Sequence, residues 1–218
     1  MRLQSLAALV LAAAASSAAI GADFGAERPS ADARFATESI LAGRGQAGLP
    51  FAVVDKAAAR LYVFDTRGRL LGAAPALLGQ QVGDETVPGV GDKPPAEVLP
   101  HERTTPAGRF VTEPGRNLEG EAVVWVDYDS GFAIHRVRPG ASYTPRVERL
   151  RSAAPAEHRV SLGCVVVEGG FFDRIVWPAF GHGAGVVYVL PETRPVASLF
   201  AAPALAVAQG NALSTPAR

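Results

Sequence analysis

The sequence has very few of the residues from which many proteins build disulfides, metal sites and nucleotide sites. Its 218 residues include one cysteine, Cys164, so no intramolecular disulfide can form. A lone thiol is either a small inert core side chain or one that is kept for its chemistry. The chain also lacks Cys-x-x-Cys, His-Glu-x-x-His and Gly-x-x-x-x-Gly-Lys-Ser/Thr motifs. We therefore expect no metal, and no cofactor is implied.

The sequence also has no excess of positive or negative charge. Lys and Arg together number 21, and Asp and Glu together also number 21. Nucleic acids and anionic membrane surfaces favour proteins with a basic excess, so neither is an expected partner. The sequence does not indicate an oligomeric state.

Residues 1–22 predict a signal peptide. Arg2 precedes a short apolar run at 6–15, and small residues then offer cleavage positions after Ala19 or Ala22. A membrane-spanning helix needs roughly 20 apolar residues, which is more than this run provides. We expect an exported protein of the periplasm or cell envelope, without an integral membrane span once the signal is cleaved.

The remaining chain divides by composition into three parts. Residues 23–50 are rich in Ala, Gly and charge, and predict a weakly ordered N-terminal segment. Residues 51–192 predict one catalytic domain, and 193–218 a low-complexity C-terminal tail.

The predicted domain is mainly β. Short β-branched and aromatic runs predict strands at 51–54, 61–64, parts of 70–78, 123–126, 132–137, 165–167 and 186–190. Turn residues at 65–68 and 127–131 predict two hairpins. Residues 80–105 carry four prolines and no periodicity, which predicts a long loop bordering the site. Short helices are expected at 145–152 and 170–177.

The most specific segment surrounds the cysteine. Cys164 follows Ser161, Leu162 and Gly163 and enters a β-branched run, which predicts a thiol at the edge of a strand. Gly163 lets the backbone turn or approach a substrate, and nearby N–H groups can hold a developing oxyanion. Ser161 either tunes this region or simply shapes a tight turn.

A nucleophilic cysteine also needs a base, and the chain offers four histidines, His101, His135, His158 and His182. His135 ends an apolar run and is the favoured candidate, either as acceptor of the thiol proton or as the imidazolium of an ion pair. His158 is the second candidate because it is close to Cys164 in sequence. A strand histidine with a purely structural role is the alternative.

Several arginines are candidates for binding carboxylates. Forked hydrogen bonds suit Arg for this task, although a charged helix face is more often simply solvated. Arg159 is favoured for substrate binding because it adjoins the cysteine motif. The other candidates are Arg136, Arg138, Arg146, Arg149 and Arg151.

These motifs, in this order, resemble the L,D-transpeptidase catalytic-domain family, in a divergent form with the Arg-x-Ser-x-Gly-Cys variant of the motif. The resemblance covers roughly 51–191 and departs at Leu162, where many members place His, and at Val166, where most place Arg or Asn. The interval of 164 − 135 = 29 positions between His135 and Cys164 is also long and suggests a lid-like insert. The matching segments are Val54 to Phe64, Thr105 to Phe110, Ile134-His135, Arg159 to Cys164, Phe171-Phe172 and Tyr188 to Pro191.

The resemblance implies a mixed-sheet sandwich or open barrel and a cell-wall enzyme acting on peptidoglycan peptide stems. In that family's reaction, the Cys164 thiolate would attack the third-residue carbonyl of a tetrapeptide stem and release D-alanine. His135 would move the proton, and N–H groups near Gly163 would stabilise the oxyanion. An amine or water would then resolve the thioacyl-enzyme. The alternatives are an L,D-carboxypeptidase, a catalytically weakened wall-binding relative, and an unrelated secreted β-sandwich with an inert cysteine.

Overall fold

The computed structural model describes residues 21–201. Apart from Gly21 and Ala22, the predicted signal peptide lies outside the described residues, and so does the tail after residue 201. Within residues 21–201, no helix is both long enough and apolar enough to cross a membrane.

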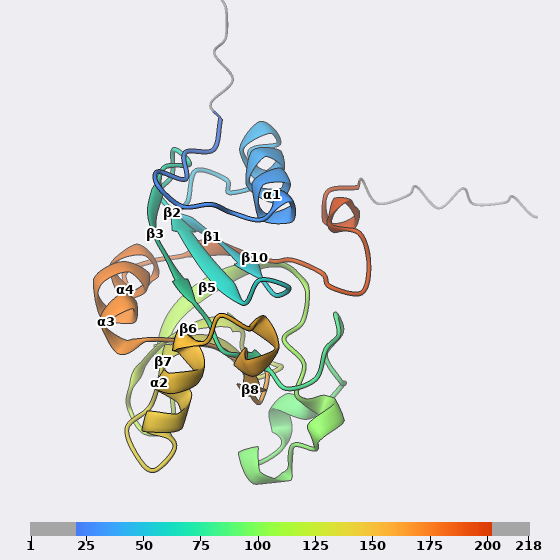
Figure 1. The fold of residues 1–218 in the computed structure, drawn as a ribbon, viewed down its shortest axis with the longest axis vertical. Helices are drawn as coiled ribbons and strands as arrows, with labels where there is room; N and C mark the ends of the chain where they lie inside the picture. The colour runs from blue at the N-terminus through green and yellow to red at the C-terminus, as the bar shows by residue number, and fades with distance from the viewer. Residues whose placement is uncertain (1–20, 202–218) are drawn as a thin grey trace, which may run out of the picture.

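An eight-stranded mixed sheet forms the centre of the molecule (Figure 1). Neighbouring strands are antiparallel except for the β1–β10 and β7–β9 pairs, which are parallel. The prediction of a mainly β, mixed-sheet domain with short helices is therefore confirmed. In spatial order, the strands are β3 (Leu70–Pro75), β2 (Arg60–Phe64), β1 (Phe51–Asp55), β10 (Gly185–Val189), β5 (Gly108–Arg116), β6 (Ala122–Asp127), β7 (Phe132–Arg136) and β9 (Val165–Val167).

The two edges of this sheet come together, so the sheet is nearly closed as a barrel. Leu77 follows the edge strand β3, and Val166 lies in the opposite edge strand β9. Their backbones exchange two hydrogen bonds, with N···O distances of 2.7 and 2.9 Å. Next to this junction, β4 (Leu78–Gly79) and β8 (Arg159–Ser161) form a small parallel pair. The barrel closure therefore sits two residues from Cys164.

The closed sheet encloses one hydrophobic core and carries a second on its other face. A helical stretch after β9 fills the first core with Phe172, Val176 and Phe180. It consists of α3 (Gly169–Phe171), η5 (Phe172–Val176) and α4 (Trp177–Phe180), which confirms and extends the helix expected at 170–177. On the other face, α1 (Ala31–Ala42) packs Ala36 and Ile40 against the sheet.

Helix α1 corrects the expectation that residues 23–50 are weakly ordered. Ser30 caps the helix by accepting a hydrogen bond from the Ala33 N–H at 3.0 Å, and it donates to Asp55 at 2.5 Å. Small alanines form the buried face together with Ile40, so the segment packs closely although its composition looks like that of a leader.

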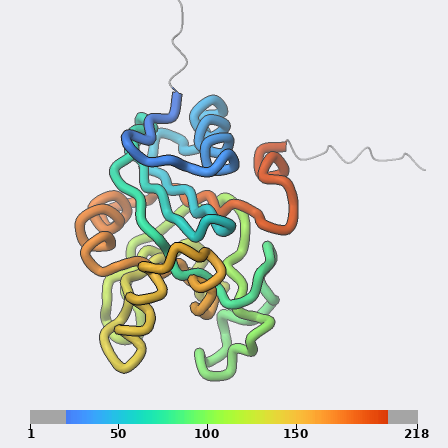
Figure 2. The backbone as a smooth tube through the Cα atoms, in the orientation of Figure 1, coloured from blue at the N-terminus to red at the C-terminus, as the bar shows by residue number. Residues whose placement is uncertain are grey.

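The C-terminal boundary also differs from the predicted one at residue 193. The helix η6 (Val196–Leu199) buries Val196, and Phe200 stacks on Tyr188 with ring centroids 5.8 Å apart. This short segment contacts α1, and the tube in Figure 2 shows both described ends at the same end of the molecule.

At the opposite end from α1 lie the helix α2 and the long loop (Figure 1). Helix α2 (Tyr143–Arg151) confirms the helix expected at 145–152. The loop predicted at 80–105 contains only the short 3-10 turns η1 (Val90–Asp92), η2 (Pro95–Glu97) and η3 (Pro100–Glu102). A fourth turn, η4 (Pro155–His158), leads into β8.

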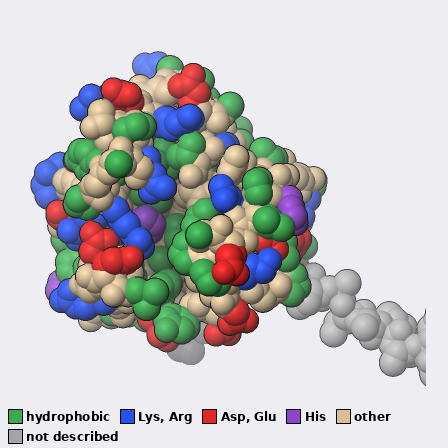
Figure 3. All heavy atoms as spheres, turned by 90° about the horizontal axis from the view of Figure 1, so that it is seen from below, with side chains coloured by type: hydrophobic (Ala, Val, Ile, Leu, Met, Phe, Trp, Pro, Cys, Tyr) green, Lys and Arg blue, Asp and Glu red, His purple; other side chains and the backbone are tan. Residues whose placement is uncertain are grey.

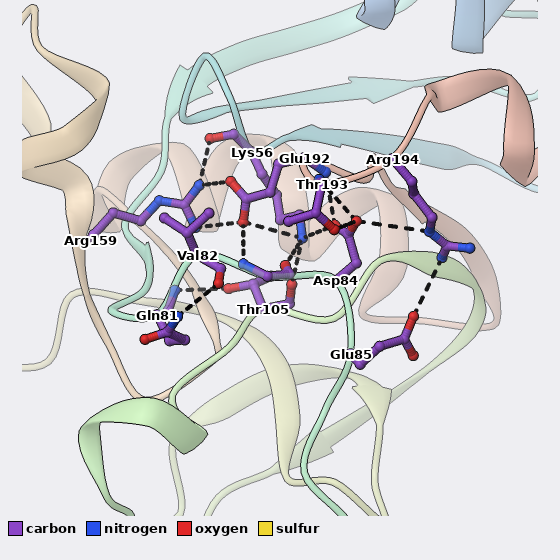
Figure 4. A network of polar contacts seen from close by, with 12 residues as sticks. Lys56, Gln81, Val82, Asp84, Glu85, Thr105, Arg159, Glu192, Thr193 and Arg194 are labelled. Carbon is purple, nitrogen blue, oxygen red and sulfur yellow. Dashed lines mark hydrogen bonds and ion pairs between the residues drawn. The ribbon is translucent and has the colours of Figure 1, made fainter.

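A buried ionic cluster ties the loop to the sheet (Figure 4). The Lys56 side chain, just after β1, is completely buried. Its ammonium group donates to the Asp84 carboxylate and the Thr105 carbonyl, both at 2.9 Å, and to the Gly83 carbonyl. Glu192 completes the surroundings of the ammonium group at 3.4 Å. One cation therefore holds three segments that are distant in sequence.

Asp84 is the best-bonded carboxylate of this cluster. It accepts from the backbone N–H groups of Glu192 at 2.8 Å and Thr193 at 3.0 Å, and from the Thr193 hydroxyl. Burial alone would raise the pKa of Asp84, but the hydrogen bonds from Thr193, Lys56 and Glu192 outweigh it and hold the pKa far below its usual range. Asp84 is therefore ionised at pH 7.

We predict that Asp84→Asn destabilises the protein by roughly 2–5 kcal/mol at pH 7, because it leaves the buried Lys56 ammonium without its main counter-charge. Since the pKa of Asp84 is depressed, its stabilisation is present above the unfolded value of about 4 and is lost as the pH falls below it. Urea unfolding across this pH range measures both effects. Glu85→Gln is the matched control, because the neighbouring Glu85 side chain is exposed, and an equal loss in both variants would contradict the prediction.

Candidate active site

The cysteine lies in a tight turn between β8 and β9 that requires its glycine. Gly163 has φ +138°, a conformation that other residues rarely adopt. A Cβ at this position would also lie 2.9 Å from the Thr104 carbonyl oxygen. Ser161 closes the turn by accepting from the Gly163 N–H at 3.1 Å and donating to the Cys164 carbonyl at 2.6 Å. The hydroxyl proton of Ser161 is therefore used in shaping the turn.

Thr105 connects this turn to the buried cluster. Its hydroxyl donates to the Gly163 carbonyl at 2.8 Å and accepts from the Gly79 N–H at 2.8 Å. Its carbonyl receives the hydrogen bond from Lys56. Because the Thr105 side chain is fully buried, these bonds fix the backbone that carries Cys164.

His135 is brought to the cysteine by the parallel pairing of β7 with β9. In this register His135 is the partner of Val166, two residues after Cys164. Side chains two residues apart on a strand share a face, so the backbone directs His135 and Cys164 to the same side. Both line a cleft of about 480 Å³ that is bordered by the 80–105 loop, as the sequence predicted. Figure 3 shows a face that is hollowed near its centre, with basic side chains on one side of the hollow.

The surroundings of His135 fix its protonation state. Its Nδ1 lies 2.8 Å from the Arg136 carbonyl oxygen, which can only accept, so Nδ1 carries the proton. Burial lowers the pKa of His135 to about 4, and the nearby cations Arg138 and Arg146 act in the same direction, although the Arg136 carbonyl opposes them. The imidazole is therefore neutral near pH 7, with its Nε2 lone pair available as a base.

The thiol is also neutral. Burial raises the pKa of the Cys164 thiol, which outweighs the lowering by the Ala133 N–H and by the guanidinium groups of Arg138 and Arg146. The sulfur lies 3.5 Å from the Gly131 carbonyl oxygen, a weak acceptor contact that suits a protonated thiol. Of the two resting states that the sequence leaves open, a thiol beside a neutral base fits better than a preformed ion pair.

The other predicted site residues lie elsewhere. His158 is buried with its two ring nitrogens 3.2 Å from the Ala76 and 3.1 Å from the Ser152 carbonyl oxygens, and it is not part of the cleft wall. Arg159 pairs with Glu192 and donates to the Lys56 carbonyl at 3.2 Å, so it belongs to the buried cluster and not to the cleft lining. Geometry thus favours His135 over His158 and leaves no observation for substrate binding by Arg159.

Residues that the sequence did not single out also form the cleft. Trp125 and Tyr128 pack edge to face with centroids 5.0 Å apart and form an aromatic part of its wall.

The two positions that depart from the family pattern lie in different surroundings. Leu162 is exposed at the cleft, whereas Val166 is buried between Leu77 and Leu150 in a small apolar cluster. The N–H groups of Leu162 and Cys164 have no acceptor in the described part of the chain, unlike that of Gly163.

No protein-family model and no curated protein matches the sequence. Among solved structures, the chain is similar to the LD transpeptidase LdtMt1 in complex with imipenem, at 20% identity and a TM-score of 0.37 over 65% of this chain. It is also similar to the Ldtfm-avibactam carbamoyl enzyme, at 17% identity and a TM-score of 0.37 over 66% of this chain. The alignments span 58% and 49% of those chains.

We predict that His135 makes the protein less stable in mild acid. Its folded pKa of about 4 lies below the unfolded value of about 6.5, so the unfolded chain binds more protons between these values. Its stabilisation is complete above about pH 6.5 and falls by up to about 3 kcal/mol toward pH 4. His135→Gln should flatten the dependence of urea unfolding on pH in this window. The exposed His101→Gln variant should retain it, and a similar slope in all three proteins would refute the assignment.

We further predict that Cys164 reacts with iodoacetamide in the folded protein, because it lines the cleft, but with the pH profile of an un-ionised thiol. The rate should rise through an inflection above the free-thiol value of about 8.5. A thiolate–imidazolium pair would instead give a rate plateau between about pH 5 and 7, and observing that plateau would disprove the neutral resting state.

Proposed function

We propose that this protein is an exported cysteine acyltransferase of the L,D-transpeptidase type, which acts on peptidoglycan peptide stems. The observation that carries the proposal is the joint placement of Cys164 and His135 on one cleft wall by the β7–β9 pair, with His135 held as the Nδ1–H tautomer. The ordered sequence motifs from Thr105 to Cys164 support the family in particular.

The first half of the proposed reaction forms a thioester. As the Cys164 sulfur attacks the carbonyl of the third stem residue, His135 Nε2 accepts the thiol proton. The C–N bond to the terminal D-alanine then breaks, and His135 returns the proton to the leaving amine. Neutral starting groups suit this route, because the proton moves only as the sulfur–carbon bond forms.

The turn around the cysteine supplies the oxyanion donors in this scheme. Because the Gly163 N–H donates to Ser161, the free N–H groups of Leu162 and Cys164 are the better candidates. Gly163 contributes by its backbone conformation, and Ser161 by holding the turn. In the second half, an amine or water attacks the thioester and gives its proton to His135, which regenerates the thiol.

The identity of the attacking group decides the biological role. An amine of a second stem gives a cross-link, a protein lysine gives wall anchoring, and water makes the protein an L,D-carboxypeptidase. The open cleft offers room for an acceptor beside the donor, since its wall extends from the cysteine turn to Trp125 and Tyr128.

We predict that the chain lacking residues 1–22 releases D-alanine from purified tetrapeptide muropeptides and that Cys164→Ala does not. His135→Gln should lower kcat/KM by roughly 10²–10⁴-fold, while His182→Gln, on an exposed turn, should leave it unchanged. Mass spectrometry of the products measures release and distinguishes cross-linked dimers from hydrolysed tripeptides. Absence of release from the unsubstituted protein would refute the enzyme and favour a wall-binding relative, and equal release by Cys164→Ala would exclude Cys164 as the nucleophile.

A further inference from the structure

Two arginines stand out on the wall of the cleft. Of the five arginines between Arg136 and Arg151, only Arg138 and Arg146 line the cleft that holds Cys164 and His135. Their guanidinium groups are the cations whose charge lowers the pKa of both Cys164 and His135. Lys93 also lines the cleft, but it is paired with Glu102 at 2.5 Å. Arg116 lines the cleft as well, but it donates to the Gly120 carbonyl at 2.6 Å, and its charge is not among those that lower the pKa of Cys164 or His135. The positive field beside the sulfur therefore comes mainly from Arg138 and Arg146.

Helix α2 is anchored in the apolar core near its C-terminal end, and this anchoring sets the position of Arg146. Leu150, one turn after Arg146, lies on the same face of the helix. Its side chain is buried against Val166 and Leu77, next to the cysteine turn. Arg146 is half-buried and has no acidic partner within 4 Å in the described part of the chain. Its charge is thus available to a ligand.

Arg138 reaches the cleft from the segment that follows β7. Its Nε atom is buried and makes no hydrogen bond among the described residues. The nearest carboxylates are Glu121, 3.5 Å from Nε, and Glu119, 3.4 Å from Nη1. Charge-assisted hydrogen bonds are normally about 2.7–2.9 Å long, so these contacts leave the donors of Arg138 largely unused.

We propose that Arg138 and Arg146 form a carboxylate-binding subsite beside Cys164, which receives a free carboxylate of the acyl-donor peptide. Two guanidinium forks suit a planar carboxylate, and they fix the direction of the donor as well as its charge. This inference rests on the proposed function for the identity of the donor. The carboxylate has two possible sources, namely the C-terminus of the leaving residue and a side-chain carboxylate on the residue that bears the scissile carbonyl.

Charge-selective alkylation tests the subsite without any turnover. Iodoacetate and iodoacetamide both form a sulfur–carbon bond with Cys164 and expel iodide, but only iodoacetate carries a carboxylate. Relative to a free cysteine derivative, the ratio of the iodoacetate rate to the iodoacetamide rate should be raised about tenfold in the protein, and 0.5 M salt should reduce it.

The ratio should return to the free-thiol value in an Arg138→Gln/Arg146→Gln double variant. The matched control is Arg149→Gln/Arg151→Gln, which removes two exposed arginines from α2 and should keep the raised ratio. Because loss of the two guanidinium charges raises the pKa of Cys164 and slows both alkylations alike, only the ratio of the two rates is compared, and circular dichroism checks that the variants remain folded. If the double variant does not fold, Arg146→Gln alone should lower the ratio, while Arg146→Lys should retain it. A free-thiol ratio in the unsubstituted protein, or a raised ratio that survives in the double variant, would overturn the subsite.

Amidated donor peptides then identify the source of the carboxylate. Amidation of the recognised carboxylate should lower kcat/KM by at least about tenfold in the unsubstituted protein and have little effect in the double variant. If amidation at neither position matters, the subsite does not bind the donor. If alkylation is charge-selective but no peptide is turned over, the proposed function fails while the anion site remains, so the two failures are distinguishable.

Discussion

The buried ammonium group of Lys56 is the interaction on which the rest of the site depends. It holds Asp84 and Glu192, and through the carbonyl of Thr105 it fixes the residue whose hydroxyl binds the Gly163 carbonyl. Removing a charge from water is costly unless every donor finds a partner, and here each one does. A loop without regular structure thereby becomes a rigid support for the cysteine turn. The cluster tolerates substitution less well than an apolar core does, because loss of one charged member leaves another buried charge unpaired.

Much of the fold could be predicted from the sequence because its strands are short and apolar. The runs at 51–54, 61–64 and 186–190 became β1, β2 and β10, and both hairpins form where the turn residues indicated. The longest strand, β5, was missed because its residues are mostly polar or exposed, and its pairing with β10 and β6 makes it a strand. Helix α1 was missed because alanine-rich packing resembles a leader in composition.

Only part of the candidate site could be predicted, because local sequence signals do not show which distant residues meet in the fold. Cys164 and His135 carry local signals, a glycine turn and a strand end, and the structure places both in one cleft. Arg159 is favoured by its nearness to the cysteine motif in sequence, which says nothing of Glu192, 33 positions away, with which it pairs. Arg146 had no such local signal. Its position depends on Leu150 packing against Val166, where the family resemblance implied a polar residue. The apolar side chain of Val166 therefore supports the helix that carries Arg146.

The protonated state of Cys164 also affects how readily its sulfur is oxidised. Peroxides and disulfides react with the thiolate and far less with the thiol, so the raised pKa of Cys164 slows sulfenic acid formation and mixed-disulfide exchange. A chain with a single cysteine has no second thiol to resolve such damage. The raised pKa thus gives the protein a chemical means of keeping the Cys164 sulfur in its reduced form.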